Sequence, residues 1–138
     1  MKPVDGELLD TLRGLLGARD ELALAVVFGS VAKGTARRSS DLDLAVLPTT
    51  ALSLEGEAQL VQAVERVTGR EVDLVRLDRT EDIVLRREIG LHGVAVREAR
   101  PGNFARFRAE AQLAWLDLEP TYLDAEARFL RRVASGSR

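Results

Sequence analysis

The stretch that decides the fold is Val26-Val27-Phe28-Gly29-Ser30, followed by ten residues and then by Asp41-Leu42-Asp43-Leu44-Ala45-Val46. An apolar run stops at the Gly-Ser pair, a loop of basic and small residues follows, and a second apolar run carries two aspartates. Because alternate side chains of a strand share a face, Asp41 and Asp43 point to one side of the predicted sheet. Two such carboxylates repel each other and lose hydration, so the pattern predicts a neutralising cation. Acidic oxygen ligands suit magnesium.

The residues and spacing of the two motifs resemble a known family signature. Gly-Ser, ten residues and Asp-x-Asp look like the signature of the nucleotidyltransferase superfamily that includes DNA polymerase beta. The fuller patterns Phe28-Gly29-Ser30-x-Ala32-x-Gly34 and Ser40-Asp41-Leu42-Asp43-Leu44 resemble its minimal nucleotidyltransferase (MNT) branch. The resemblance covers roughly residues 20 to 98. Its specificity comes from the setting, since the two motifs lie between two predicted strands.

The Gly-Ser turn is the expected phosphate site. Gly29 lets the backbone approach a ligand closely, and the N–H groups that open the following turn attract anions. In the superfamily this turn holds the β and γ phosphates of a nucleoside triphosphate, which implies that Gly29 and Ser30 bind ATP. Lys33, Arg37 and Arg38 lie in the same connection. A solvated basic loop explains each of these cations equally well, so none is assigned a phosphate contact.

The aspartates are the expected catalytic centre. In the family pattern both residues of Asp-x-Asp bind Mg2+, and a third carboxylate on a neighbouring strand completes the site. Asp73 fits that position, because it interrupts an apolar alternation as Asp43 does. The resemblance therefore implies Asp41, Asp43 and Asp73 as catalytic and metal-binding residues. Glu71 shares the face of Asp73 and is the alternative, and a charge that protects an edge strand is the other interpretation of Asp73.

Hydrophobic periodicity predicts the elements around these motifs. Apolar runs, continuous or alternating, predict strands over residues 22–28, 41–47, 71–77 and 93–96. Apolar spacings of three and four predict helices over 5–18, 55–68 and 80–89, with a short helical turn over 30–37. Gly69 and Gly90 are expected to end the second and third of these helices. We expect an α/β (α+β) nucleotidyltransferase fold: a mixed sheet of about four strands, with helices mainly on one face.

A C-terminal helical segment follows the predicted core. We divide the chain into a nucleotidyltransferase core, residues 1–100, and a segment 101–138 packed on the core or on a partner, within a single domain. Pro120 disfavours helical backbone just before it, which predicts a break or kink. Five of the six aromatic residues lie here: Phe104, Phe107, Trp115, Tyr122 and Phe129. They indicate either a cap over one side of the sheet or a partner surface.

Composition excludes several classes of function. The 138 residues include no cysteine, which excludes disulfides, zinc–thiolate sites and a cysteine nucleophile. A net charge of −2 argues against nucleic acid as the partner and favours small anions or a protein. No apolar run approaches the ~20 residues of a membrane span, and the first residues lack the apolar core of a signal peptide. We therefore expect a cytoplasmic protein that does not enter a membrane.

The resemblance also implies a function. MNT proteins commonly form the antitoxin half of a pair whose toxin is a helical HEPN ribonuclease. The resemblance implies Mg2+-dependent transfer of AMP from ATP to a tyrosine of that toxin. It is compatible with an oligomer of this chain or a hetero-oligomer with the toxin. Two alternatives remain. One is an antitoxin that neutralises by binding alone, and the other is an aminoglycoside-type nucleotidyltransferase, which usually carries a larger substrate domain than a tail of under forty residues supplies.

Overall fold

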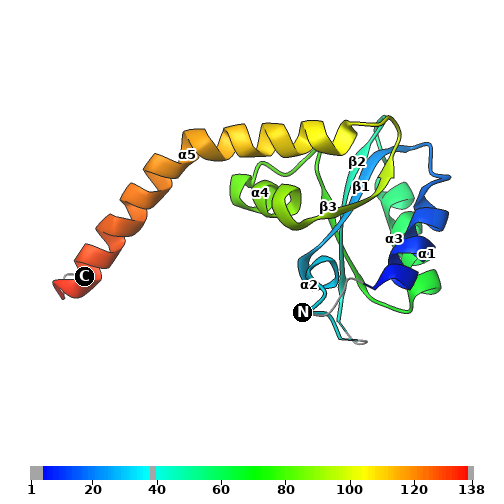
Figure 1. Ribbon diagram of the computed structural model, residues 1–138, viewed down its shortest axis with the longest axis horizontal. Coiled ribbons are helices and arrows are strands. Elements are labelled where there is room, and N and C mark those ends of the chain that lie inside the picture. The colour runs from blue at the N-terminus through cyan, green and yellow to red at the C-terminus, as the bar shows by residue number, and fades with distance from the viewer. Residues whose placement is uncertain (1–4, 38–39, 137–138) are drawn as a thin grey trace.

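A four-stranded sheet in the order β3-β2-β1-β4 forms the centre of the molecule (Figure 1). The computed structural model describes residues 5–37 and 40–136. The strands are β1 (Leu22–Phe28), β2 (Leu42–Pro48), β3 (Val72–Arg76) and β4 (Val94–Glu98). Strand β1 is antiparallel to β2 and to β4, whereas β2 and β3 are parallel. The predicted α/β fold with a mixed sheet of four strands is confirmed.

One face of the sheet is covered by α1 (Gly6–Leu16) and α3 (Leu54–Thr68). Their leucines and valines pack against the strand side chains that point to this face. Both helices begin within one residue of their predicted starts, and the N-cap side chains of Asp5 and Ser53 accept hydrogen bonds from the backbone N–H groups of Leu8 and Gly56. Gly69, with φ of 69°, follows α3 as expected.

The second face is covered by α4 (Ile83–His92) and the first part of α5 (Asn103–Ala134). Ile89, Phe104, Phe107 and Ala111 from these helices are buried on the other side chains of the strands. The expectation that helices lie mainly on one face is therefore wrong. Its physical reason lies in β1, whose residues are almost all buried and so require cover on both sides.

Gly90 does not end α4, contrary to the prediction. It lies buried within the helix, where a Cβ atom would stand 3.4 Å from the Cα atom of Arg108 in α5. The Nε of Arg108 donates a hydrogen bond to the carbonyl oxygen of Gly90 at 2.8 Å. This glycine therefore allows two helices to approach closely. The helix ends two residues later, at His92, and Gly93 is its C-cap.

Helix α5 runs through Pro120 without a break and changes direction partway along its length (Figure 1). A proline inside a helix removes one backbone donor and favours a bend, so the predicted disruption takes the form of a kink. The first part caps the sheet, as the burial of Phe104 and Phe107 shows. The second part leaves the core and projects into solvent (Figure 1). No helix within residues 5–37 and 40–136 is long and apolar enough to cross a membrane.

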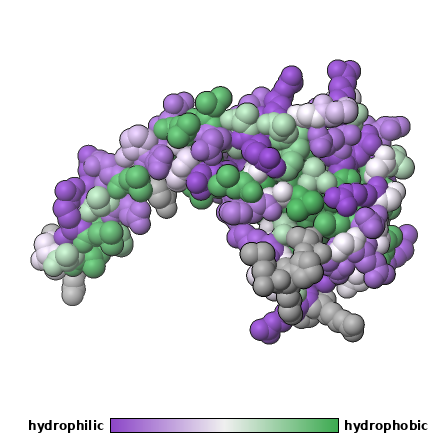
Figure 2. Space-filling view, in the orientation of Figure 1, coloured by the Kyte–Doolittle hydropathy of each residue, from purple (hydrophilic) through white to green (hydrophobic). Residues whose placement is uncertain are grey.

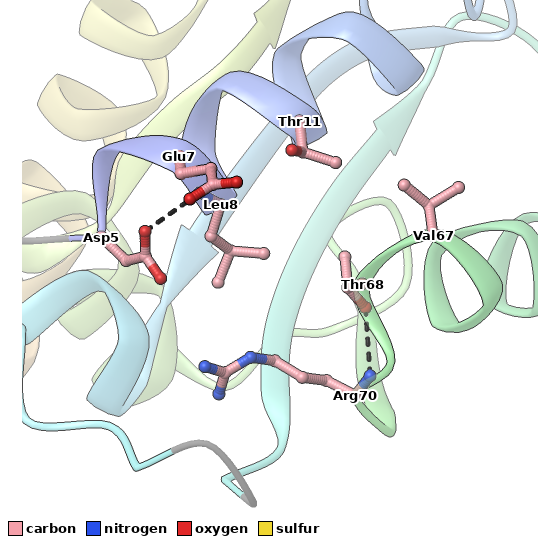
Figure 3. Close-up of a pocket in the computed structure, with 7 residues that line it drawn as sticks. All are labelled: Asp5, Glu7, Leu8, Thr11, Val67, Thr68 and Arg70. Carbon is pink, nitrogen blue, oxygen red and sulfur yellow. Dashed lines mark hydrogen bonds between the residues drawn. The ribbon is translucent and has the colours of Figure 1, made fainter.

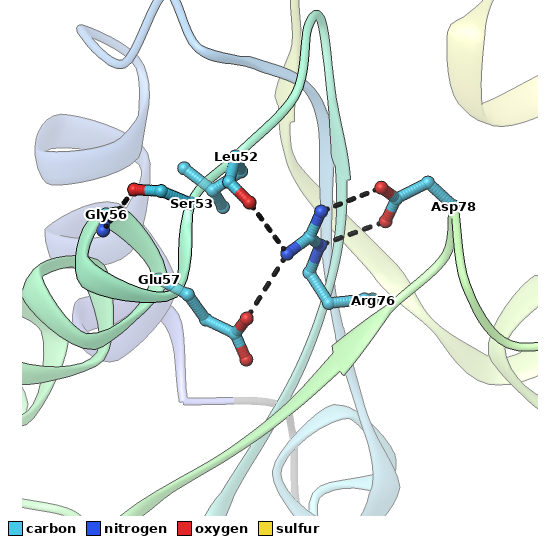
Figure 4. Close-up of polar contacts among 6 residues, drawn as sticks. All are labelled: Leu52, Ser53, Gly56, Glu57, Arg76 and Asp78. Atoms are coloured by element: carbon cyan, nitrogen blue, oxygen red, sulfur yellow. Dashed lines mark hydrogen bonds and ion pairs between the residues drawn. The ribbon is translucent and has the colours of Figure 1, made fainter.

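A buried arginine ties β3 to α3 and to the loop before it (Figure 4). Arg76 is 8% exposed. Its guanidinium donates to both carboxylate oxygens of Asp78, at 2.9 and 2.7 Å, and to Glu57 at 3.2 Å. It also donates to the carbonyl oxygen of Leu52 at 3.3 Å. The hydrogen bond from Arg76 lowers the pKa of Asp78 below its ordinary value of 3.8.

Replacing Asp78 with asparagine is expected to lower the free energy of unfolding by about 2 kcal/mol, because Arg76 would keep only Glu57 as a charged partner. The depressed pKa of Asp78 contributes stability that is complete above 3.8 and is lost as the pH falls through the lowered pKa. Urea unfolding at neutral pH should therefore separate the two proteins, and the difference should shrink in acid. Asp10→Asn, which touches an exposed ion pair only, is the control.

Candidate active site

The Gly-Ser turn joins the end of β1 to a short helix. Gly29 has φ of 70° and opens α2 (Gly29–Lys33), which ends at Gly34 with φ of 74°. A positive φ favours glycine at both positions. Ser30 lies in the first turn of this helix, and its carbonyl oxygen accepts hydrogen bonds from the N–H groups of Thr35 and Ala36. The helical turn predicted over 30–37 is thus one residue earlier and shorter, with Phe28 as its N-cap.

The Gly-Ser turn lies directly against Asp43. Phe28 pairs with Asp43 in the antiparallel register of β1 and β2. A Cβ atom added to Gly29 would overlap the Oδ2 atom of Asp43. Glycine is therefore required here twice, for its backbone angle and for the space that the carboxylate occupies. The expected phosphate turn and the expected metal-binding strand share one small volume.

The acids gather at the same edge of the sheet. Asp43 and Asp73 are direct partners in the parallel register of β2 and β3, so their side chains share a face. Asp41 lies two residues before Asp43, just ahead of the strand. Burial raises the pKa of Asp43 above 3.8, and the charges of Asp73 and Asp41 raise it further. Among residues 5–37 and 40–136, no ion pair joins a basic side chain to any of these three aspartates.

The donor chemistry of this cluster fits a hard divalent cation, since it consists of carboxylate oxygens with unbalanced charge. Within residues 5–37 and 40–136, however, no three acidic or histidine side chains are already gathered closely enough to hold a metal ion. Asp41 and Asp73 are exposed, so their side chains have room to rotate. Glu71, the alternative to Asp73, is exposed and lies before β3 begins.

The basic residues of the connection have different surroundings. The Nζ atom of Lys33 lies 2.6 Å from the Oε1 atom of Glu88 on α4. This hydrogen bond is the main cause that lowers the pKa of Glu88. Lys33 therefore already has a carboxylate partner. Arg37 is exposed, and Arg38 lies outside the described residues.

Arg70 is a positioning residue that the sequence did not reveal. Its Nη1 atom donates to the carbonyl oxygens of Arg37, at 2.9 Å, and of Ser40, at 3.1 Å. These two hydrogen bonds fasten the connection immediately before Asp41. An arginine directly after a helix-ending glycine is typical of a solvated turn, and nothing in its local sequence signals these distant partners.

A separate hollow of about 210 Å³ lies between the start of α1 and the end of α3 (Figure 3). Asp5 and Thr68 in its wall already serve local structure, because they accept hydrogen bonds from the N–H groups of Leu8 and Arg70. It lies apart from the acidic cluster, and no ligand is assigned to it. The lining residues are Asp5, Glu7, Leu8, Thr11, Val67, Thr68 and Arg70.

A strand that ends in a Gly-Ser turn, beside a strand carrying Asp-x-Asp in a mixed sheet of this order, is the architecture of nucleotidyltransferases. Comparison with known proteins agrees. The family described as "Polymerase beta, Nucleotidyltransferase" matches residues 10–100, and the chain belongs to this family.

Individual relatives extend the comparison. Protein adenylyltransferase MntA of Shewanella oneidensis is 36% identical over 73 residues, which are 53% of this chain and 52% of that protein. The match thus spans about half the length of that relative. A crystal structure of a toxin–antitoxin with AMP-PNP aligns with a TM-score of 0.66 and 26% identity, covering 86% of this chain and 98% of the other. A minimal nucleotidyltransferase structure aligns with a TM-score of 0.53 and 34% identity, covering 62% and 86%.

Proposed function

We propose that this chain transfers AMP from ATP to a tyrosine hydroxyl of a helical HEPN toxin, and that it is the antitoxin of that toxin. The observation that carries the proposal is the placement of Asp43 beside Asp73 in register and against the Gly29 turn. The activity named for MntA and the AMP-PNP of the toxin–antitoxin structure support the nucleotide and the type of reaction. AMP-PNP is an analogue of ATP.

Asp41, Asp43 and Asp73 are the proposed ligands of Mg2+, which when bound would neutralise the negative charge of the triphosphate. The backbone at Gly29 and the hydroxyl of Ser30 donate hydrogen bonds to the β and γ phosphates and so orient the α-phosphorus. The tyrosine oxygen forms a bond to the α-phosphorus while the bond from that phosphorus to the bridging oxygen breaks. Asp73 accepts the tyrosine proton, and pyrophosphate leaves.

Catalysis and partner binding are assigned to different parts of the chain in this proposal. Residues 1–100 are the proposed catalytic core, and residues 101–138 are the proposed partner-binding segment of the same domain. Such a pair would act in the cytoplasm, where ATP and the RNA substrate of a ribonuclease are found. Neutralisation by binding alone is the second candidate, and the exposed apolar residues of α5 favour it.

Labelling separates these two candidates. The chain is incubated with the HEPN toxin proposed as its partner, Mg2+ and ATP labelled at the α-phosphorus. We expect label on a toxin tyrosine and loss of ribonuclease activity. ATP labelled at the γ-phosphorus should leave the toxin unlabelled, because that phosphate departs in pyrophosphate. A toxin that is silenced while it carries no label would contradict AMP transfer and support neutralisation by binding.

A further inference from the structure

Helix α5 exposes a row of leucines on both sides of Pro120. Leu113, Leu116, Leu123 and Leu130, here called the leucine seam, are 64%, 52%, 50% and 57% exposed. The second part of α5 projects away from the sheet (Figure 1), and hydrophobic residues recur along it between hydrophilic ones (Figure 2). Four leucines left in water along one helix are an unusual arrangement for a chain of this size.

The spacing of the seam indicates what covers it. The seam continues through Pro120, Ala127 and Ala134, so that the steps between positions alternate between three and four residues over three heptads. That repeat of 3.5 residues is the pattern of a helix that packs along another helix. Leucine occupies every d position, at 116, 123 and 130, and alanine occupies two of the four a positions, at 127 and 134. The occupant is therefore an α-helix.

The protein's own core does not cover the seam. Phe107 is buried against the sheet. Leu116 follows it by nine residues, which at about 100° per residue places the two on opposite sides of α5. The seam faces away from the sheet over the first part of the helix, and beyond the bend the sheet no longer lies beneath it (Figure 1). The leucine seam is therefore not covered by the protein's own core.

The charges beside the seam indicate the chemistry of the partner. Asp117 and Asp124 occupy e positions, and Glu119 and Glu126 occupy g positions. Asp124 pairs with Arg128 at 2.9 Å, and the other three acids have no ion pair with the basic residues of the part of the chain that the structure describes. Arg131 occupies the third e position. In an antiparallel pair of identical helices centred on Leu123, Asp124 would meet its own copy and Glu119 would meet Glu126, while only Asp117 would meet Arg131, so repelling contacts outnumber attracting ones. The flanks instead complement a helix that carries lysine or arginine beside its apolar stripe.

We propose that the leucine seam of α5 docks an amphipathic helix of a different chain, with basic residues flanking its apolar stripe. Resting on the function proposed above, we infer that this helix belongs to the toxin. The seam contains neither the residues of the Gly29 turn nor the three aspartates, so substitutions in it change the docking surface without altering the proposed catalytic residues.

The test uses the full chain and the purified HEPN protein in titration calorimetry. Leu123→Glu combined with Leu130→Glu should weaken binding by about 100-fold or more, because two leucines buried in the complex would be lost. Leu54→Glu, which changes a leucine that is 77% exposed on α3, should leave binding unchanged. Circular dichroism and AMP-PNP affinity should match the wild type in both variants. Unchanged binding by the seam variant overturns the proposal.

Charge reversal tests the chemistry of the partner. Glu119→Lys combined with Glu126→Lys should weaken binding by about tenfold at low salt, and the difference should fade as salt rises. Tighter binding would show acidic flanks on the partner and overturn the proposal. A dimer of this chain that the seam substitutions abolish, seen by sedimentation, would assign the seam to a second copy instead.

The two proposals fail separately. If the wild type labels the toxin while the seam variant binds it as tightly as the wild type does, docking lies elsewhere and AMP transfer stands. If the wild type binds through the seam but transfers no AMP, the docking surface stands and the catalytic proposal fails. A wild type that does not bind the toxin at all overturns the docking proposal.

Discussion

Replacing Asp43 with asparagine is expected to reduce AMP transfer by about 10²–10⁴-fold while the protein remains folded. Asparagine keeps the shape that fits against Gly29 but removes one of the three charges proposed to bind Mg2+. It also removes the repulsion between Asp43 and its register partner Asp73. Because this rim is solvated, the gain in stability should stay below about 1 kcal/mol. The melting temperature should therefore equal or slightly exceed that of the wild type.

Initial rates with α-labelled ATP and thermal melting measured on the same samples check both halves of this expectation. Asp20→Asn is the matched control, because it removes the charge of a fully exposed aspartate whose one ion pair among the described residues, with Arg97, is 3.9 Å long. The control should retain full activity. A variant at Asp43 that loses cooperative unfolding would assign this residue to the fold, and a variant that transfers AMP normally would remove it from the site.

The same substitution also distinguishes neutralisation by AMP transfer from neutralisation by binding alone. An antitoxin that acts by binding alone would neutralise the toxin fully without Asp43, because the leucine seam of α5 is unaltered. An antitoxin that acts by AMP transfer would lose neutralisation together with labelling. The residue is therefore informative in a cell-based assay of toxicity as well as in the test tube.

The central strand-turn-strand unit was predictable because its determinants are local. A glycine at the end of an apolar run and two aspartates at alternate positions fix a turn and a shared face without reference to the rest of the chain. Asp73 was placed by the same alternation together with the family resemblance. The structure adds that its strand pairs with β2 in parallel, directly opposite Asp43. Its role as a ligand stays a prediction.

The remaining features depend on contacts between distant parts of the chain. Gly90 has the local signature of a helix end, but close packing against Arg108 of α5 keeps it inside the helix. Arg70 reaches the carbonyl oxygens of residues 33 and 30 positions away. Lys33 meets Glu88 only because α4 folds back over the sheet. Local propensity carries no information about such partners.

Replacing Gly29 with alanine is expected to lower AMP transfer by about 100-fold, because the new methyl group would displace the carboxylate of Asp43 from the phosphate turn. The substitution also places a side chain at φ of 70°, which costs about 1 kcal/mol by itself. Activity and stability should both fall, and the loss of stability should exceed the cost of the backbone strain alone.

Gly69→Ala separates the two causes, since Gly69 has φ of 69° and nothing within 4 Å of an added Cβ atom. It should lose about 1 kcal/mol of stability through the same backbone strain and keep its activity. The difference in unfolding free energy between the two variants then measures the overlap with Asp43, and the difference in rate measures its effect on catalysis. Equal activity in both variants would mean that the carboxylate beside Gly29 is not part of the reacting site, whatever the family pattern implies.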